Sequence, residues 1–360
     1  MNEAVAVIKP RRGIRKIEIT GMILVGLSLL GLIFNPGFIS GIFDAMLNKA
    51  FPIMVQVFLT GKVGVAIIIS VLIGRILERC GFTDALMRLL LPVTRLIKIN
   101  SAVLVPAVYN ILGDINAAGR IAGPILVKAG ATKDEQKIAI CTMVQSQQSF
   151  STFMFCIIAL TAIQAKVFVI ILISVFAPLF IVPALLKLTL WRDTKAVALE
   201  DMPSFTPNTG ILPTIFGAAR EGAELLFLLI IPAVGVIFAL IGAMDYIGLW
   251  KPIESGLSSL LSALSIDPKS GIVTILASPT LATAQLKDVA TTLSPELVIG
   301  SVVLAASGFP LSVILGQIPA IWSDATDLTH VEAMGAAVLG AVMRLLTAGL
   351  IATVLTPFLL

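Results

Sequence analysis

The stretch SAVLVPAVYNILGDINAAGR, residues 101–120, interrupts a very apolar chain with polar side chains. It starts as an apolar helix of about two or three turns, breaks, and resumes as a helix rich in alanine and glycine. The polar and glycine residues of the break and of the second arm are Asn110, Gly113, Asp114, Asn116 and Arg120. A charged side chain at the centre of an apolar membrane helix is unfavourable by about 2.5–3.5 kcal/mol. We therefore predict that this stretch is half of a binding site.

The composition of the chain is that of a helical membrane protein. Its 360 residues are 58% hydrophobic and 13% charged, with a mean hydropathy of +1.03. A soluble protein of this length carries about 25% charged residues. Apolar segments of about 20 residues, the length that crosses a bilayer as a helix, recur along the chain. The sequence thus predicts an all-α polytopic membrane protein.

Catalytic and metal-binding chemistry are not indicated. Cys80, Cys141 and Cys156 are far apart and form no CxxC pair. His330 is the single histidine, which excludes a histidine-based metal site or catalytic triad. We therefore predict no enzyme activity, no catalytic or metal-ligating residues and no cofactor. The net charge of +4 comes from basic residues at helix ends, where they set topology, and does not indicate nucleic-acid binding.

The N-terminus predicts the orientation of the chain. A basic arm, residues 1–17, precedes the apolar run 19–34. Basic residues favour the cytoplasmic side, so we predict a retained first helix with a cytoplasmic N-terminus in a bacterial-type inner membrane. Residues 41–56 are mildly amphipathic, and we predict that they lie at the opposite interface.

The next segments alternate between a span and an interfacial helix. Residues 62–79 form a predicted span, and the arginines at its end, Arg75 and Arg79, are interpreted as topology anchors. Residues 83–98 are amphipathic, carry basic residues on one side and are interrupted by Pro92. They predict an interfacial helix.

A polar patch lies within the helix that follows the first broken segment. Thr132 and Glu135 have the spacing of a capping box, which predicts a helix through residues 141–155, CTMVQSQQSFSTFMF. In a continuous helix the side chains three, four and seven residues after the first would form one stripe. The members of that stripe are Gln145, Gln148, Ser149 and Thr152. A polar stripe is unfavourable against lipid, so we predict that it faces the broken segment.

The second half of the chain repeats the order of the first. Ile99-Asn100 corresponds to Ile266-Asp267, after which a second broken segment begins, PKSGIVTILASPTLATAQLKD at 268–288. Ser294 is predicted to cap the following helix as Thr132 does, and a polar patch, SGFP, lies at 307–310. The candidate site residues of this half are Ser278, Thr280, Thr283, Gln285 and Ser307.

The repeat unit determines the predicted topology. Each unit contains a span, an interfacial helix, a re-entrant hairpin and two further spans, so an odd number of crossings inverts the second unit relative to the first. With the first helix added, we predict about seven full spans and two hairpins. The predicted parts are an N-terminal arm, first helix and interfacial segment (1–57), a first repeat (58–192), a polar linker (193–213) and an inverted second repeat (214–360).

Paired breaks in inverted repeats indicate a solute site near the middle of the membrane. A break leaves backbone N–H and C=O groups unpaired, so it must be buried in protein or line a cavity. The half-helix N-terminus near residues 116–120 adds donors and a partial positive charge. Amides and hydroxyls suit a small polar solute such as a nucleoside or nucleobase, and they also replace water around a cation.

The sequence leaves the role of several residues open. The stripe at 145–152 either lines the site or holds helices together, at about 0.6 kcal/mol for each hydrogen bond. Asp114 and Arg120 either form a structural ion pair or take part in binding. Arg344, inside the last predicted span, either pairs with Asp288 or Asp114 or extends toward the membrane surface.

Two groups of motifs carry a family resemblance: PAVYNILGDINAAGRIAGP at 106–124 with the helix through residue 151, and ASPTLATAQLKD at 277–288 with SGFP at 307–310. Their order resembles the nucleoside-recognition or Gate domain family, which includes concentrative nucleoside transporters, the membrane domain of ferrous iron transporters and spore-maturation membrane proteins. In the nucleoside transporters the hairpin tips and adjacent unwound helices bind nucleoside and sodium. The resemblance implies that role here for Asn110, Gly113, Asp114, Asn116, Gln145, Gln148, Ser149, Ser278, Thr280, Thr283, Gln285 and Ser307.

The predicted function is that of a permease for a small polar solute, nucleoside-like, working by alternating access in the lipid bilayer and coupled to Na⁺ or H⁺. The chain departs from the family in having no glutamate in either hairpin and no cytosolic GTPase domain. Two other functions stay open: a non-transporting membrane assembly protein of the spore-maturation type, and a metal-ion permease. The resemblance also implies assembly into homo-oligomers.

Overall fold

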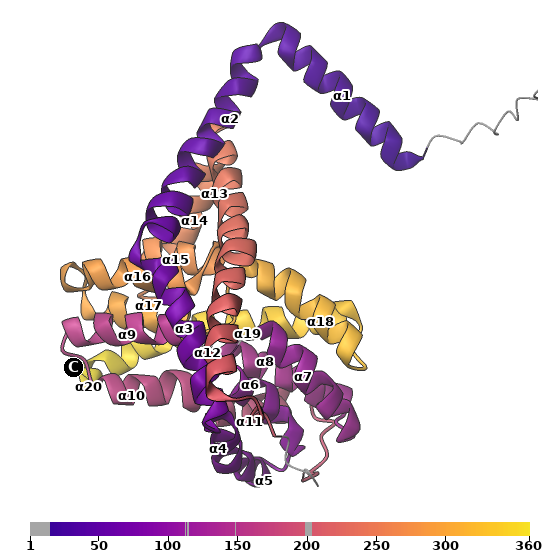
Figure 1. The fold of residues 1–360 in the computed structure, drawn as a ribbon, viewed down its shortest axis with the longest axis vertical. Helices are drawn as coiled ribbons and strands as arrows, with labels where there is room; N and C mark the ends of the chain where they lie inside the picture. Colours follow the sequence, from indigo (N-terminus) through magenta and orange to yellow (C-terminus); the bar gives the residue numbers. More distant parts are fainter. Residues whose placement is uncertain (1–14, 112, 114, 148, 199–203) are drawn as a thin grey trace, which may run out of the picture.

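The structure, a computed structural model, describes residues 15–111, 113, 115–147, 149–198 and 204–360. Every regular element in these residues is a helix (Figure 1). Segments labelled η are 3-10 or π-helical turns, and several of them continue an α-helix. The first half contains α1 (Lys16–Phe34), α2 (Pro36–Phe51), η1 (Pro52–Leu59), α3 (Lys62–Arg79), α4 (Phe82–Leu90), η2 (Leu91–Val93), α5 (Thr94–Ile97), η3 (Ser101–Leu104), α6 (Val105–Tyr109), α7 (Ile115–Lys128), α8 (Lys133–Gln145), α9 (Phe150–Ala162), α10 (Val167–Ile171), η4 (Leu172–Phe176) and α11 (Pro178–Thr189).

The second half has the same order of parts: a long helix, a shorter amphipathic helix, two short helices joined by a break, a helix that breaks and resumes, and a final long helix. The repeat itself stays a prediction. An inverted arrangement is defined relative to a bilayer and stays a prediction. The second half contains α12 (Ile211–Glu224), η5 (Leu225–Ile230), α13 (Ile231–Tyr246), α14 (Trp250–Ala263), α15 (Pro268–Leu276), α16 (Pro279–Val289), η6 (Ala290–Thr292), α17 (Pro295–Ala305), η7 (Val313–Gln317), α18 (Ile318–Ala325), α19 (His330–Leu350), η8 (Ile351–Leu355) and α20 (Thr356–Leu359).

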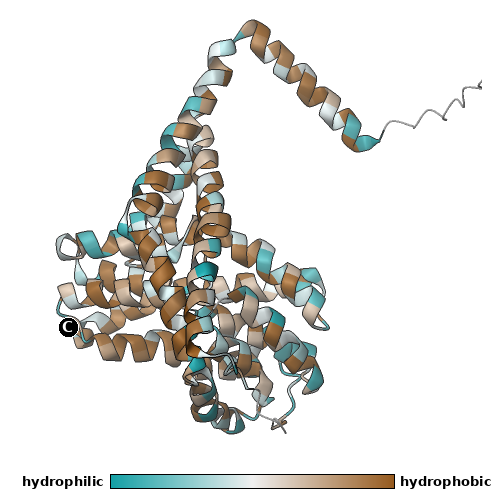
Figure 2. Ribbon diagram, in the orientation of Figure 1, coloured by the Kyte–Doolittle hydropathy of each residue, from teal (hydrophilic) through white to brown (hydrophobic). Residues whose placement is uncertain are grey.

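Five helices in the described part of the chain are long and apolar enough to cross a membrane, a property of a multi-pass membrane protein. Figure 2 shows apolar residues along most of their length. Four of them coincide with predicted spans. Two other predicted spans are interrupted at their polar patches, between α8 and α9 and between α17 and α18, and the predicted span α3 carries charged residues at both ends. The five are Lys16–Phe34, Pro36–Leu59, Val167–Thr189, Ile211–Tyr246 and His330–Leu359.

The segment 41–56, predicted to lie at the interface, is part of the continuous helix Pro36–Leu59, which is long and apolar enough to cross a membrane. Its amphipathic pattern reflects packing against α13. A Cβ on Gly242 would lie 2.4 Å from a backbone oxygen of α2, and the Nζ of Lys49 lies 3.3 Å from Oδ2 of Asp245. Ala45 and Lys49 of this helix therefore face α13.

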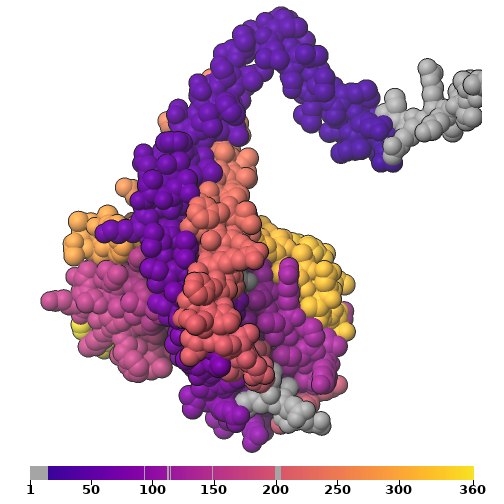
Figure 3. Space-filling view, in the orientation of Figure 1, coloured from indigo at the N-terminus to yellow at the C-terminus, as the bar shows by residue number. Residues whose placement is uncertain are grey.

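Two long helical segments cross one face of the molecule side by side: α2–η1–α3, and α12–η5–α13 (Figures 1 and 3). Where α12 crosses α3, a Cβ on Gly222 would lie 3.0 Å from Cα of Ile68, so the two backbones are in close contact. The remaining helices, except α1, gather beside this pair. None of the residues of α1 is buried, and the helix extends away from the body.

Helix caps determine where the central helices begin. The predicted capping box is confirmed: Thr132 Oγ1 accepts the backbone N–H of Glu135, and the Glu135 carboxylate accepts the N–H of Thr132 at 3.0 Å. In the second half Ser294 is the N-cap of α17, but its side chain makes no capping hydrogen bond. The proline at the first helical position, Pro295, favours a helix start there without one.

The described part of the predicted linker packs against the first half. Glu135 Oε1 accepts the N–H groups of Lys195 and Asn100, each at 2.9 Å, and the N–H of Ser101 donates to the carbonyl of Val197 at 2.9 Å. A single buried carboxylate thus joins the linker to the start of the first broken segment.

A second contact of the linker depends on Asp84 in α4. Its carboxylate accepts the N–H of Phe205 at 2.7 Å and the hydroxyl of Thr206 at 2.5 Å, with a longer bond from Ser204. Burial raises the pKa of Asp84, but these hydrogen bonds outweigh burial and hold the pKa below its usual 3.8. The carboxylate therefore stays ionised to a lower pH in the folded protein than in the unfolded chain.

Asp84→Asn is expected to flatten the acid limb of the stability profile. Because the folded pKa is depressed, the stabilisation is present above the unfolded pKa and is lost as the pH falls through the folded pKa. Melting temperature should fall between about pH 5 and pH 3 more steeply in the wild type than in Asp84→Asn. Asp324→Asn, at an exposed position in α18, should keep the wild-type slope. Equal slopes for the Asp84 variant and the wild type would contradict this account.

Candidate functional site

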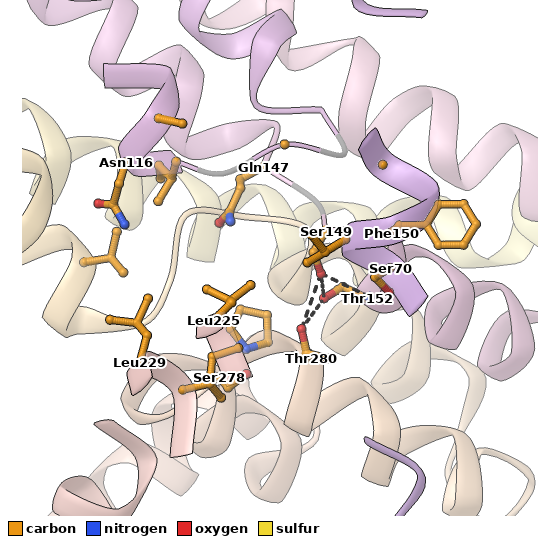
Figure 4. Close-up of a pocket in the computed structure, with 18 of the residues that line it drawn as sticks. Ser70, Asn116, Gln147, Ser149, Phe150, Thr152, Leu225, Leu229, Ser278 and Thr280 are labelled. Carbon is orange, nitrogen blue, oxygen red and sulfur yellow. Dashed lines mark hydrogen bonds between the residues drawn. The ribbon is translucent and has the colours of Figure 1, made fainter. Parts of the chain in front are cut away.

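A cavity of about 510 Å³ lies between the two halves of the chain. Ligand sites for small molecules commonly have about 300–1,000 Å³. It is lined by residues of α3, α12 and η5 and by short segments where helices break (Figure 4). We number these breaks in chain order: the first at 110–114, the second at 146–149, the third at 277–278 and the fourth at 306–310.

The first break contributes a glycine to the cavity wall, and the start of α7 contributes an amide. Gly113 lines the cavity, and a Cβ there would lie 2.3 Å from the backbone oxygen of Tyr109, so a glycine is required. Asn116, in the first turn of α7, also lines the cavity. Asn110 is fully buried behind this wall, and its Nδ2 donates to the carbonyl of Met143 at 3.4 Å. Asp114 lies outside the described residues.

The second break corrects the predicted polar stripe, since the helix does not continue through it. α8 ends at Gln145, and Ser149 is the N-cap of α9, where its Oγ accepts the N–H of Thr152 at 3.3 Å. Serine hydroxyls compete for backbone groups and so favour such ends. Gln145 is fully buried, and its Nε2 donates to the carbonyl of Gly340 at 2.5 Å. Gln148 lies outside the described residues.

Gln147 lines the cavity although the sequence analysis did not select it. Figure 4 shows its amide and that of Asn116 at the same end of the cavity. The Oε1 atom of Gln147 is buried and makes no hydrogen bond to the protein. A signal was present, because Gln147 belongs to the polar run at 145–152, but the helical-stripe interpretation placed it on another face.

Hydroxyl groups beside the second and third breaks form one cluster. Ser278 lines the cavity and is the N-cap of α16, where its Oγ accepts the N–H of Leu281 at 3.3 Å. Thr280 Oγ1 lies 2.9 Å from the hydroxyl of Thr152 and 3.4 Å from that of Ser149. These bonds, dashed in Figure 4, join the N-termini of α9 and α16 at the cavity wall.

The fourth break packs directly against the first two. The N–H of Gly308 donates to the carbonyl of Val144 at 2.8 Å, close to the end of α8. A Cβ on Gly308 would lie 2.9 Å from Cδ1 of Ile115, the first residue of α7. Ser307 lines the cavity and is almost fully buried, with its hydroxyl donating to the carbonyl of Leu304. The four breaks thus meet around one space.

Besides Asn110 and Gln145, three predicted site residues among the described ones do not line the cavity. Arg120 is exposed on α7, Thr283 donates its hydroxyl to the carbonyls of Pro279 and Thr280 in its own helix, and Gln285 is not part of the cavity wall. Their positions along a helix carry them past the break and away from the cavity.

An ionic group in the cavity wall was missed by the sequence analysis. Arg75, interpreted there as a topology anchor, donates from Nε and Nη2 to the carboxylate of Glu221 at 2.8 and 2.5 Å, and from Nη1 to Glu78 at 2.6 Å. All three residues line the cavity. The pairing joins α3 to α12 and could not be read from sequence, because the partners are 146 residues apart.

Metal ligation is not indicated by the described residues, in which no group of three or more His, Cys, Asp or Glu side chains is placed to hold a metal ion. The polar groups that face the cavity are mainly hydroxyls and amides. Hydroxyls and amides are uncharged and both donate and accept hydrogen bonds, so they suit a neutral polar molecule.

Thr280→Val is expected to weaken the hydroxyl cluster while keeping the shape of the side chain. Loss of two hydrogen bonds should lower the free energy of unfolding by about 1–2 kcal/mol and reduce solute affinity about 10-fold. Thr353→Val, at an exposed position where the hydroxyl bonds only within its own helix, should change neither quantity. Melting curves and solute titrations of the two variants measure this, and equal behaviour would contradict it.

The fold resembles that of a solved transporter. No protein-family model matches the chain, and no curated protein matches it. A structure of CNTnw, a concentrative nucleoside transporter, in its intermediate 1 state is similar over 93% of this chain and 85% of that chain, with a TM-score of 0.51 and 14% sequence identity. At this identity the similarity concerns the fold alone. The chain is therefore a helical membrane protein with a transporter-like fold.

Proposed function

We propose that the protein is a secondary permease for a small polar solute, nucleoside-like in chemistry, which binds in the cavity between the two halves. The observation that carries the proposal is the meeting of four helix breaks around one cavity. Unpaired backbone groups are unfavourable in lipid, so broken helices persist where they line a site. The similarity to the fold of a nucleoside transporter supports the same interpretation.

The helix ends at the cavity favour a solute with hydrogen-bond acceptors. Ser149 and Ser278, the N-caps of α9 and α16, both line the cavity, as does Asn116 near the start of α7. The N-terminus of a helix carries a partial positive charge and free N–H donors. Carbonyl, hydroxyl and ring-nitrogen acceptors of a base or sugar would be stabilised there.

In this proposal the first and third breaks are the tips of two re-entrant hairpins, related by an inverted repeat, and alternating access exposes the cavity to each side in turn. Sodium or a proton supplies the driving force. The N-terminus is cytoplasmic, the membrane is of the bacterial inner-membrane type, and copies of the chain assemble as homo-oligomers.

A thermal-shift screen of the purified protein tests the proposal. Nucleosides, nucleobases, small organic acids and divalent metal ions are each added with and without sodium. A permease of the proposed kind should melt several degrees higher, about 3 °C or more, with one neutral polar class. A response to metal ions alone would favour a metal-ion permease. No response across the panel, with a membrane protein that co-purifies, would favour an assembly protein.

A further inference from the structure

Arg344 is a fully buried charged residue that does not line the proposed site. It lies in α19, and its Nη1 donates to the backbone carbonyl of Ser174 at 2.7 Å. Ser174 belongs to η4, a π-helical turn, in which the regular helical hydrogen-bond pattern is altered. The Nε and Nη2 atoms of Arg344 are buried and make no hydrogen bond.

No carboxylate neutralises Arg344 among the described residues. Asp288 is exposed and pairs with Lys287, and no ion pair between Arg344 and a carboxylate occurs in the described residues. The other expected partner, Asp114, lies outside the described residues. A guanidinium cannot release its proton in a protein, so the residue brings a permanent positive charge into the core.

The register between α8 and α19 places Arg344 close to the level at which α8 ends. The two helices run side by side in the same direction: Lys133 pairs with Glu332, and further along Gln145 donates to the carbonyl of Gly340. Gln145 is the last residue of α8. Arg344 lies four residues, about one turn, beyond Gly340 on α19, at the level where α8 has ended.

The end of α8 is a place where a cation is favourable. The C-terminus of a helix carries a partial negative charge. The carbonyls of Met143 and Val144 accept N–H groups from Asn110 and Gly308, but Gln145 Oε1 is buried and has no hydrogen-bond partner. In transporters with broken helices, such C-terminal ends coordinate the coupling ion.

We propose that Arg344 is a resident cation, which supplies at the C-terminus of α8 the positive charge that a bound sodium ion would otherwise supply. If the protein is a permease as proposed, its driving ion does not bind at this point as sodium. The expected effect on stability is independent of the permease proposal. Removing the charge should leave a vacancy that an external monovalent cation can fill.

Melting curves in sodium chloride and in choline chloride, at equal ionic strength and without solute, test the proposal. The wild type should melt at the same temperature in both salts. Arg344→Gln should melt about 4 °C lower in choline chloride and recover part of that loss in sodium chloride. Arg344→Lys, which keeps the charge, should be insensitive to sodium. Arg95→Gln, at an exposed position in α5, should behave as the wild type.

Three results would overturn the proposal. The first is a wild type that sodium stabilises as much as it stabilises Arg344→Gln. The second is an Arg344→Gln variant that melts like the wild type in both salts. If Arg344→Gln does not fold, Arg344→Lys decides: a folded, sodium-insensitive lysine variant supports the resident charge, and a lysine variant that also fails to fold overturns it. Solute uptake is not measured, so a failure of the permease proposal would not affect this result.

Discussion

Gly308→Val is expected to abolish solute uptake while the protein still inserts and folds. A Cβ at this position would lie 2.9 Å from Cδ1 of Ile115 and 3.3 Å from Cα of Val144. Both neighbours belong to helices that end at the cavity, so the fourth break would be pushed away from the first and second. Overpacking of this kind costs about 1–3 kcal/mol, which is tolerable for folding but large for the geometry of a site. We expect initial uptake rates to fall about 100-fold or more.

Gly316→Val is the matched control for this variant. Gly316 lies in η7, on the same broken helix, and a Cβ there would meet no atom within 4 Å. Uptake and detergent-solubilised melting temperature should both stay close to the wild type. If the two valine variants transport equally well, the contact between the fourth break and the other breaks has no part in the site.

Gln147→Leu is expected to lower the affinity for the solute without lowering the stability of the protein. Gln147 Oε1 is buried in the cavity wall with no hydrogen-bond partner in the protein. A buried, unpaired polar atom is unfavourable, so an apolar side chain of similar size should leave the melting temperature unchanged or raise it. A solute that hydrogen-bonds to the amide should lose about 1–3 kcal/mol of binding free energy, which is 5- to 150-fold in affinity.

Gln56→Leu provides the comparison, because Gln56 is exposed on η1 and does not line the cavity. Its solute affinity should equal that of the wild type. A Gln147 variant that loses both stability and affinity in parallel would indicate a structural role for the amide. A variant that keeps full affinity would exclude it from the site.

Local sequence signals were sufficient for several helix starts and for part of the site. The capping box at Thr132 and Glu135 predicted the start of α8 correctly, because its hydrogen bonds are formed within one turn. The third break was visible from Ser278 and Pro279, which favour a helix start. The first break was visible from Gly113, where the structure requires a residue without a side chain.

The second break could not be predicted in the same way. Periodicity alone allowed Gln145 and Ser149 to lie on one continuous helix, and the stripe argument followed from that. In the structure the end of α8 is stabilised by two hydrogen bonds to the other half of the chain. The N–H of Gly308 donates to the carbonyl of Val144, and Nε2 of Gln145 donates to the carbonyl of Gly340. Contacts between residues so far apart in sequence have no local signal.

Charged residues were misread for a related reason. Arg75 looked like a topology anchor at a helix end, but its position beside Glu221 depends on the crossing of α3 and α12. For Arg344 the sequence left open an ion pair or an extension toward the membrane surface, and the structure shows a hydrogen bond to the carbonyl of Ser174. In both cases the partner is determined by the packing of helices that are distant in sequence, and not by the residues next to the charge in the sequence.

Uptake into proteoliposomes tests the central claim most directly. The solute that stabilises the purified protein in the thermal-shift screen is supplied outside, with and without an imposed sodium or proton gradient, to vesicles that contain wild-type protein, Gly308→Val or Gly316→Val. The account predicts gradient-driven accumulation by the wild type and Gly316→Val and background levels for Gly308→Val. A solute that binds but is not moved by any of the three, under either gradient, would contradict it.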